Sequence, residues 1–204
     1  MIDCNGNSAT VANTAPSTRD ERAASILYVD NSNGEPSLMC ATVNSKGVKS
    51  NGQPIITGVE TFQVLYGTRE VTAGMAPTVT LGITWKAPPT SPSWTEGPAD
   101  MYLRADQLTV TSGSAAQNII DTNANWRRVR SVRIGMILRG PPNSAQNTDT
   151  STFYPFGRGK SSSGVPGSGF ASTSDPGSAF VAPADGRLRQ VLTFSVHLRN
   201  YQGL

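Results

Sequence analysis

The stretch WRRVRSVRIGMILRG, residues 126–140, decides how this sequence is expected to fold. Its residues alternate in character from Val132 onward, which is the period of a β-strand with two different faces. One face of the predicted strand carries Val132, Ile134, Met136 and Leu138, and the other carries Arg133, Gly135, Ile137 and Arg139. We expect the arginines to lie on the wetter face, where their stems cover apolar neighbours while the charged heads stay in water.

The C-terminal segment RLRQVLTFSVHLRN, residues 187–200, has the same period from Leu192 onward and predicts a second strand. Two alternating segments of similar length, each with arginines among its outward positions, are typical of antiparallel partners in one sheet. Between them lies a Gly-, Ser- and Pro-rich insertion over residues 140–186. A structureless loop of that length is uncommon in a compact domain, so we expect it to be either functional or mobile.

Further elements are predicted upstream of residue 126. The segments SILYVD (25–30) and SLMCATV (37–43) flank NSNGEP, and its Asn-Gly pair favours a hairpin because it tolerates positive φ. Residues 55–67 favour a strand by their β-branched and aromatic content, although 55–62 would also suit one or two helical turns. We expect residues 1–24 to form an irregular arm and residues 68–98 a proline-rich surface excursion. Residues 99–110 are expected to be β-like, and residues 111–125 to form a loop with a short turn.

Composition places the chain among exported, β-rich proteins. Charged residues make up 15% of its 204 residues, while Gly, Pro, Ser, Thr and Asn are abundant. A length of this order fits one domain, which we assign to residues 1–204. No apolar run reaches the roughly 18 residues of a membrane span, and no basic-then-apolar leader opens the sequence. The sequence as given is therefore expected neither to span a membrane nor to carry its own export signal.

The two cysteines, Cys4 and Cys40, predict a disulfide. Their spacing lacks the CxxC pattern of a redox motif and the His neighbours of a zinc site. A bridge is the simplest interpretation for an exported chain, with two free thiols as the alternative. By loop-closure entropy it would contribute about 3 to 4 kcal/mol and hold the N-terminal arm in place.

Residues that support catalysis or hold a cofactor are scarce. The segment GRGKSSSG (157–164) matches only the end of a phosphate-binding loop, because Tyr154 stands where that motif requires its first glycine. His197 is the single histidine and has no acidic or nucleophilic partner marked by the sequence. The 14 acidic residues are scattered, without a close carboxylate pair. We therefore predict no enzyme activity, no catalytic residue, no cofactor and no metal site.

Nucleic-acid binding is the alternative that the arginines raise. A candidate basic face consists of Arg127, Arg128, Arg130 and Arg133. A platform for single strands needs aromatic side chains on the same exposed face, and Trp126 is the only aromatic residue of this stretch. Lys and Arg outnumber Asp and Glu by only 17 to 14, too small an excess to imply a polyanion partner by itself. The sequence favours a solvated strand face.

The order of several segments carries a family resemblance. The chain presents in succession GEPSLMC, QPIITGVETFQVLYG, ADMYLRA, a Trp with VRSVRIGMILRG, and DGRLRQVLTFSVHLRN. This succession resembles the C-terminal region of PilW-like minor pilins of bacterial type IV pili. In that family a GVE…QYG segment, a W…V…VR strand and a terminal R…F…V.LRN strand recur in this order. The resemblance covers roughly residues 25–67 and 99–200.

The resemblance implies a pilin-like fold, mainly β or α+β, with an antiparallel sheet and long loops. It also implies an N-terminal spine helix, but the leader, its cleavage site and that helix are not found in this sequence. The implied function is structural: assembly or priming of the pilus with other minor pilins and the major pilin. The implied location is the periplasm and the extracellular pilus, with the full-length protein anchored in the inner membrane.

Two surfaces are candidates for those contacts. Unpaired sheet edges can accept another strand. The polar insertion also contains unusual aromatic residues, and exposed aromatic residues often anchor interfaces: Phe153, Tyr154, Phe156 and Phe170. The alternative function is a tip-displayed adhesin or DNA-binding receptor, whose partner would be a surface receptor or DNA.

Overall fold

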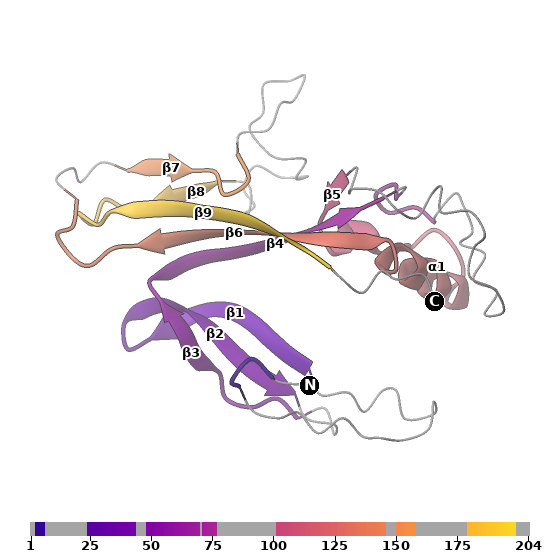
Figure 1. The fold of residues 1–204 in the computed structure, drawn as a ribbon, viewed down its shortest axis with the longest axis horizontal. Helices are drawn as coiled ribbons and strands as arrows, with labels where there is room; N and C mark the ends of the chain where they lie inside the picture. The colour runs from indigo at the N-terminus through magenta and orange to yellow at the C-terminus, as the bar shows by residue number, and fades with distance from the viewer. Residues whose placement is uncertain are drawn as a thin grey trace. The chain divides into compact units, whose positions relative to one another are not determined.

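The computed structural model describes residues 3–6, 24–43, 48–69, 71–76, 101–145, 150–157 and 179–198. These residues form antiparallel sheets and an α-helix (Figure 1), in agreement with the predicted mainly β class. The chain divides into two compact units. Unit 1 comprises Met1–Phe62, Met136–Pro155 and Ala179–Leu192, and unit 2 comprises Gln63–Gly135, Phe156–Ser178 and Thr193–Leu204.

Unit 1 begins with the predicted hairpin, which is confirmed. Strands β1 (Ala24–Ser32) and β2 (Glu35–Val43) pair antiparallel, with Ser32 opposite Glu35. The turn residues Asn33 and Gly34 have φ of 53° and 81°, the left-handed values that a two-residue hairpin needs at both positions. Strand β3 (Gln53–Thr57) pairs with the other side of β2 to complete a three-stranded sheet.

Residues 55–67 do not form one continuous strand, and that prediction was wrong at Gly58. The chain breaks there between β3 and β4 (Val59–Thr68). Gly58 has a φ of 79°, and an added Cβ would lie 2.8 Å from the carbonyl oxygen of Arg139. Its N–H donates to Pro36 O and its carbonyl accepts from the Arg139 N–H, each at 2.7 Å. Only a glycine fits this close approach without strain.

The second sheet has the strand order β5-β4-β6-β9, with β5 at Met101–Leu103, β6 at Val129–Arg139 and β9 at Arg189–His197. Gly140 N–H donates to Leu188 O, and Leu198 N–H donates to Arg130 O. These bonds lie ten residues apart on each strand and in opposite order, so β6 and β9 run antiparallel. The predicted partnership of the two alternating segments is therefore confirmed.

The loop expected over 111–125 is instead a helix, α1 (Ala115–Trp126). Ser114 caps it, its Oγ accepting from the Gln117 N–H at 3.3 Å. The Ser-x-x-Gln spacing of a capping box was the sequence signal for this start. Trp126 thus ends a helix and does not open the strand. The β-like segment 99–110 is also shorter than predicted, because β5 gives way to a 3₁₀ helix, η2 (Asp106–Leu108).

Unit 2 packs these elements around a small apolar core. Its buried members are Val71, Leu103 and Leu108, with Tyr66 and Val129 packed against them. Trp126 contacts the Tyr66 ring edge-on, with 4.7 Å between ring centroids. Buried Asn125 donates from Nδ2 to the carbonyl oxygens of Met75 and Leu108, at 2.9 and 3.1 Å. The end of α1 is thereby fixed against β4 and η2.

The insertion is not structureless in its described part. Within 140–186, β7 (Ser151–Phe153) pairs antiparallel with β8 (Phe180–Ala182). The predicted disulfide is present: Cys4 and Cys40 are bonded with their Cα atoms 6.0 Å apart, which ties residues 3–6 to β2. Phe170, most of the arm 1–24 and the proline-rich residues 77–98 lie outside the described residues.

Candidate assembly surfaces

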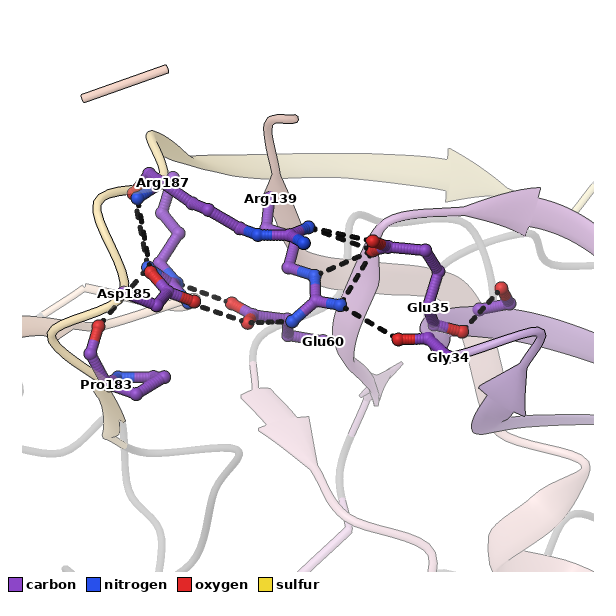
Figure 2. A network of polar contacts seen from close by, with 9 residues as sticks. Gly34, Glu35, Glu60, Arg139, Pro183, Asp185 and Arg187 are labelled. Atoms are coloured by element: carbon purple, nitrogen blue, oxygen red, sulfur yellow. Dashed lines mark hydrogen bonds and ion pairs between the residues drawn. The ribbon is translucent and has the colours of Figure 1, made fainter. Parts of the chain in front are cut away.

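Six charged residues of unit 1 form an ion-pair cluster, which Figure 2 shows in part. Three are acidic and three are arginines, so the formal charges balance: Glu35, Glu60, Asp185, Arg139, Arg187 and Arg189. They come from β2, β4, the end of β6, the β8–β9 connection and the start of β9. The cluster thus links strands that are far apart in the sequence.

Arg189 is the most buried member, with its side chain 3% exposed. Its Nε donates to Glu60 at 2.7 Å, and its Nη1 and Nη2 each donate to Asp185 at 2.7 Å. Glu60 is itself only 7% exposed. A guanidinium presents a planar fork of donors that matches carboxylates in this way, and its charge is compensated despite burial.

Glu35 receives the other two arginines, as Figure 2 shows. Arg139 donates from Nε and Nη2 at 3.0 and 2.7 Å, and Arg187 donates from Nη1 at 2.9 Å. Arg139 also lies 3.8 Å from Glu60, so it joins the two halves of the cluster. The first residue of β2 is thereby tied to the last residue of β6.

These contacts shift the ionisation of the carboxyl groups. Hydrogen bonds from Arg139 and then Arg187 hold the pKa of Glu35 below its usual value. The hydrogen bonds from Arg189 lower the pKa of Asp185 to about 2. In turn Asp185, followed by Glu60, raises the pKa of Arg189. All three shifts favour the charged forms, so Glu35, Asp185 and Arg189 are ionised near neutral pH.

The cluster is structural in character, since its charges are matched within the protein. A cavity of about 200 Å³ lies beside it, lined among others by Phe153, Asp185 and Arg189, and this is smaller than the roughly 300 Å³ where ligand pockets begin. Within the described ranges no three His, Cys, Asp or Glu side chains form a metal-binding group. The expectation that the arginines keep their charged heads in water was wrong for Arg139 and Arg189, because both donate hydrogen bonds to carboxylates of the cluster.

The four arginines of the candidate basic face have different surroundings. Arg127 is exposed at the end of α1, whereas Arg128 is only 2% exposed. Arg133 lies over the Tyr102 ring, 4.7 Å from its centroid, in a cation–π contact. Arg130 is half-buried on β6. The structure does not bring the four together on one exposed surface.

The described aromatic residues of the insertion are half-buried. Phe153 ends β7, lies opposite Phe180 of β8 and lines the cavity. Tyr154 and Phe156 follow on either side of buried Pro155. Part of their apolar surface is therefore already covered by other parts of the protein.

Four exposed apolar residues of the second sheet lie at alternate positions on β9 and just beyond it. We call these side chains the β9 apolar row, and they are between 40% and 45% exposed: Leu192, Phe194, Val196 and Leu198. The sequence identified their alternation but placed them toward a core. Among the described strands, β9 ends the order and pairs only with β6, so fewer described residues cover its side chains. The same strand begins with buried Arg189.

Comparison with known families identifies the chain. The family model described as type IV pilus-assembly protein W matches residues 26–200. The chain belongs to the type IV pilus-assembly protein W family. The match runs from within β1 to beyond the end of β9 and so includes all three described sheets and the β9 apolar row. No curated protein and no solved structure matches the chain.

This family acts in type IV pilus assembly, so the protein is involved in building the pilus. No helix among the described residues is both long and apolar enough to cross a membrane. For a pilus-assembly protein the relevant chemistry is contact with other pilus components. The β9 apolar row is one exposed apolar feature of the described surface.

Proposed function

We propose that this family member is a minor pilin, a structural subunit that helps to assemble or prime the pilus by packing against other minor pilins and the major pilin. The family match over residues 26–200 is the observation that supports this role. The protein would then work in the periplasm before assembly and on the extracellular pilus afterwards. Its full-length form would be anchored in the inner membrane before assembly.

The β9 apolar row supports a contact mechanism for this subunit. Its four large side chains lie at alternate positions and therefore share one side of the strand. Covering what remains exposed of each would contribute about 1 kcal/mol by the hydrophobic effect. A neighbouring subunit that covers the row thus gains several favourable contacts at once.

The test is pilus assembly by a variant with a polar row. Phe194→Ser combined with Val196→Ser removes two large apolar groups from an exposed strand, and we expect surface pili to be lost in the organism that encodes this chain. Gln190→Ser is the matched control, because it changes an exposed polar residue of the same strand. Pili are counted by electron microscopy, and protein levels are compared by immunoblot. Normal piliation with the double variant would contradict the proposal.

The aromatic residues of the insertion stay a proposed second contact. Phe153, Tyr154 and Phe156 retain part of their surface, and aromatic anchors are common at interfaces. The receptor alternative has weaker support, because a DNA surface needs several exposed cations together and Arg128 is buried.

A further inference from the structure

Strand β1 forms one edge of the three-stranded sheet of unit 1. Among the described strands it pairs only with β2. In a two-residue hairpin the residues that flank the turn, here Ser32 and Glu35, form a hydrogen-bonded pair. Bonded and non-bonded pairs alternate along antiparallel strands, so the even-numbered residues of β1 bond to β2. The main-chain groups of the odd-numbered residues, from Ser25 to Asn31, therefore point away from the sheet.

Hydrogen bonds on the far side of β2 agree with this alternation. Thr42 lies opposite Ser25, and its carbonyl oxygen accepts from the Ser50 N–H at 2.8 Å. The carbonyl oxygen of Pro36 likewise accepts from the Gly58 N–H at 2.7 Å. Since both carbonyls point away from β1, the residues of β1 opposite them also direct their main-chain groups outward.

The open part of this edge extends from Ser25 to Val29. Among the described residues, none bonds to the outer main-chain groups of Leu27 or Val29. Ser25 takes part in a contact through its side chain, where Oγ accepts from the Cys4 N–H at 3.1 Å. Further along, the Asn31 N–H donates to Asp30 Oδ1 at 2.8 Å, so that donor is already used.

The sequence of the open stretch is SILYV, which favours strand addition. It contains no proline and no charged residue, although these are the usual means by which proteins protect an edge. Its residues have high β-propensity, and Ile26 and Leu27 are 38% and 41% exposed. By contrast, edge strand β3 contains Pro54 and a register shift, and edge strand β5 has only three residues.

The open stretch is complementary to itself. In an antiparallel pair of two copies centred on Leu27, outward-facing residues meet outward-facing residues, as hydrogen bonding requires. Ile26 of one copy then lies opposite Tyr28 of the other, a β-branched and aromatic pair of the kind that stabilises sheets. Asp30 lies opposite Ala24, so the two acidic side chains stay apart.

We infer that β1 is a strand-addition site whose occupant is β1 of a second copy of this chain, paired antiparallel about Leu27. The two three-stranded sheets would then form one continuous sheet. The inference deepens the proposed assembly role and rests on it for its setting. Its test uses purified chain in solution, so self-pairing and the role in pilus assembly can fail separately.

Cross-linking a mixture of two variants, Ala24→Cys and Asp30→Cys, tests the pairing and its register. In the proposed pair these positions lie opposite each other with Cα atoms about 4.5 Å apart, within the range that a disulfide spans. The native bridge joins Cys4 to Cys40, which lies opposite Leu27 and so on the other face of the sheet from both new thiols. We expect a disulfide-linked dimer in the mixture under mild oxidation, seen on a non-reducing gel.

Each cysteine variant alone is the matched control. In the proposed register its two copies lie six residues out of step, about 20 Å apart at 3.3 Å per residue, too far for a disulfide. We therefore expect no cross-link in either single-variant sample. Equal cross-linking in the single-variant samples, or none in the mixture, would overturn the inference.

A second measurement does not depend on the cysteine variants. Leu27→Pro removes an outward N–H while leaving the hydrogen bonds to β2 in place, as proline permits at an edge. Leu27→Val keeps that N–H and is the control. Analytical ultracentrifugation should show a weak, concentration-dependent dimer for the unaltered chain and for the valine variant, because one strand pair is a small interface, and a monomer for the proline variant. Monomers for all three proteins would overturn self-pairing and leave the edge to a strand of another subunit.

Discussion

Strands β6 and β9 have the same alternating sequence pattern but opposite patterns of burial. On β6, Met136 and Ile137 are both buried although they point to opposite faces. On β9, the apolar row is about 40% exposed while Arg189 is buried. The difference follows from position, because among the described strands β6 lies between β4 and β9, whereas β9 is the last of the order. Alternation shows which residues share a face, and the neighbours of the strand decide which face is covered.

The largest expected effect on stability comes from creating a cavity at a buried residue of β6. Ile137 is fully buried, so Ile137→Ala should lower the free energy of unfolding by about 3 kcal/mol through lost contacts and an unfilled cavity. The matched change on β9 is Leu192→Ala, which should cost less than about 1 kcal/mol because much of that side chain is already in water. Urea denaturation of both variants measures the difference. Equal losses would mean that β9 is covered as β6 is.

A smaller effect is expected when buried Arg189, at the start of β9, loses one of its charged partners. Glu60→Gln removes the charge that faces buried Arg189, and we expect a loss of about 2 kcal/mol, typical of a hydrogen bond to a charged group. Arg189 keeps Asp185 as a partner, which limits the loss.

The control is an ion pair whose carboxylate is exposed. Asp106→Asn weakens a bidentate contact with Arg104 at 2.8 and 2.6 Å, but Asp106 is largely exposed, so the loss should stay below about 1 kcal/mol. Thermal or urea unfolding compares the two variants. A Glu60 variant no less stable than the Asp106 variant would show that burial does not strengthen the cluster.

The smallest expected effect is the loss of folding stability at low pH that follows from protonation of the cluster's carboxylates. The folded pKa of Asp185 lies at about 2, below its ordinary 3.8, and that of Glu35 is also lowered. A carboxyl group with a depressed folded pKa stabilises the fold above its unfolded pKa and loses that contribution as pH falls through the folded value. Stability should therefore be flat near neutral pH and fall between about pH 4 and pH 2. Asp185→Asn should flatten this fall, and an unchanged acid slope in unfolding curves would count against the assignment.

Local chemistry made part of the fold predictable. The Asn33–Gly34 turn and the β9 alternation were identified correctly because each depends on residues close together in the sequence. Helix α1 was missed, although Ser114 and Gln117 marked its start. The break at Gly58 was missed because its cause, the carbonyl of Arg139, lies far away along the chain.

The candidate assembly surfaces were likewise predictable from the sequence only in part. The residues of the β9 apolar row were visible in the sequence as a group, but their exposure was not. The ion-pair cluster was not predicted, since Arg189 and Glu60 lie 129 residues apart. No local spacing marks such a pair.

By itself the sequence determined the strand periods, the hairpin turn, the choice of two cysteines for a single bridge and the resemblance to PilW-like pilins. The tertiary structure decided which strand is central, which face is covered and which arginines meet carboxylates. The physical reason is range. Turn geometry and side-chain alternation are set by neighbouring residues, whereas burial and ion pairing depend on segments that only the folded sheet brings together.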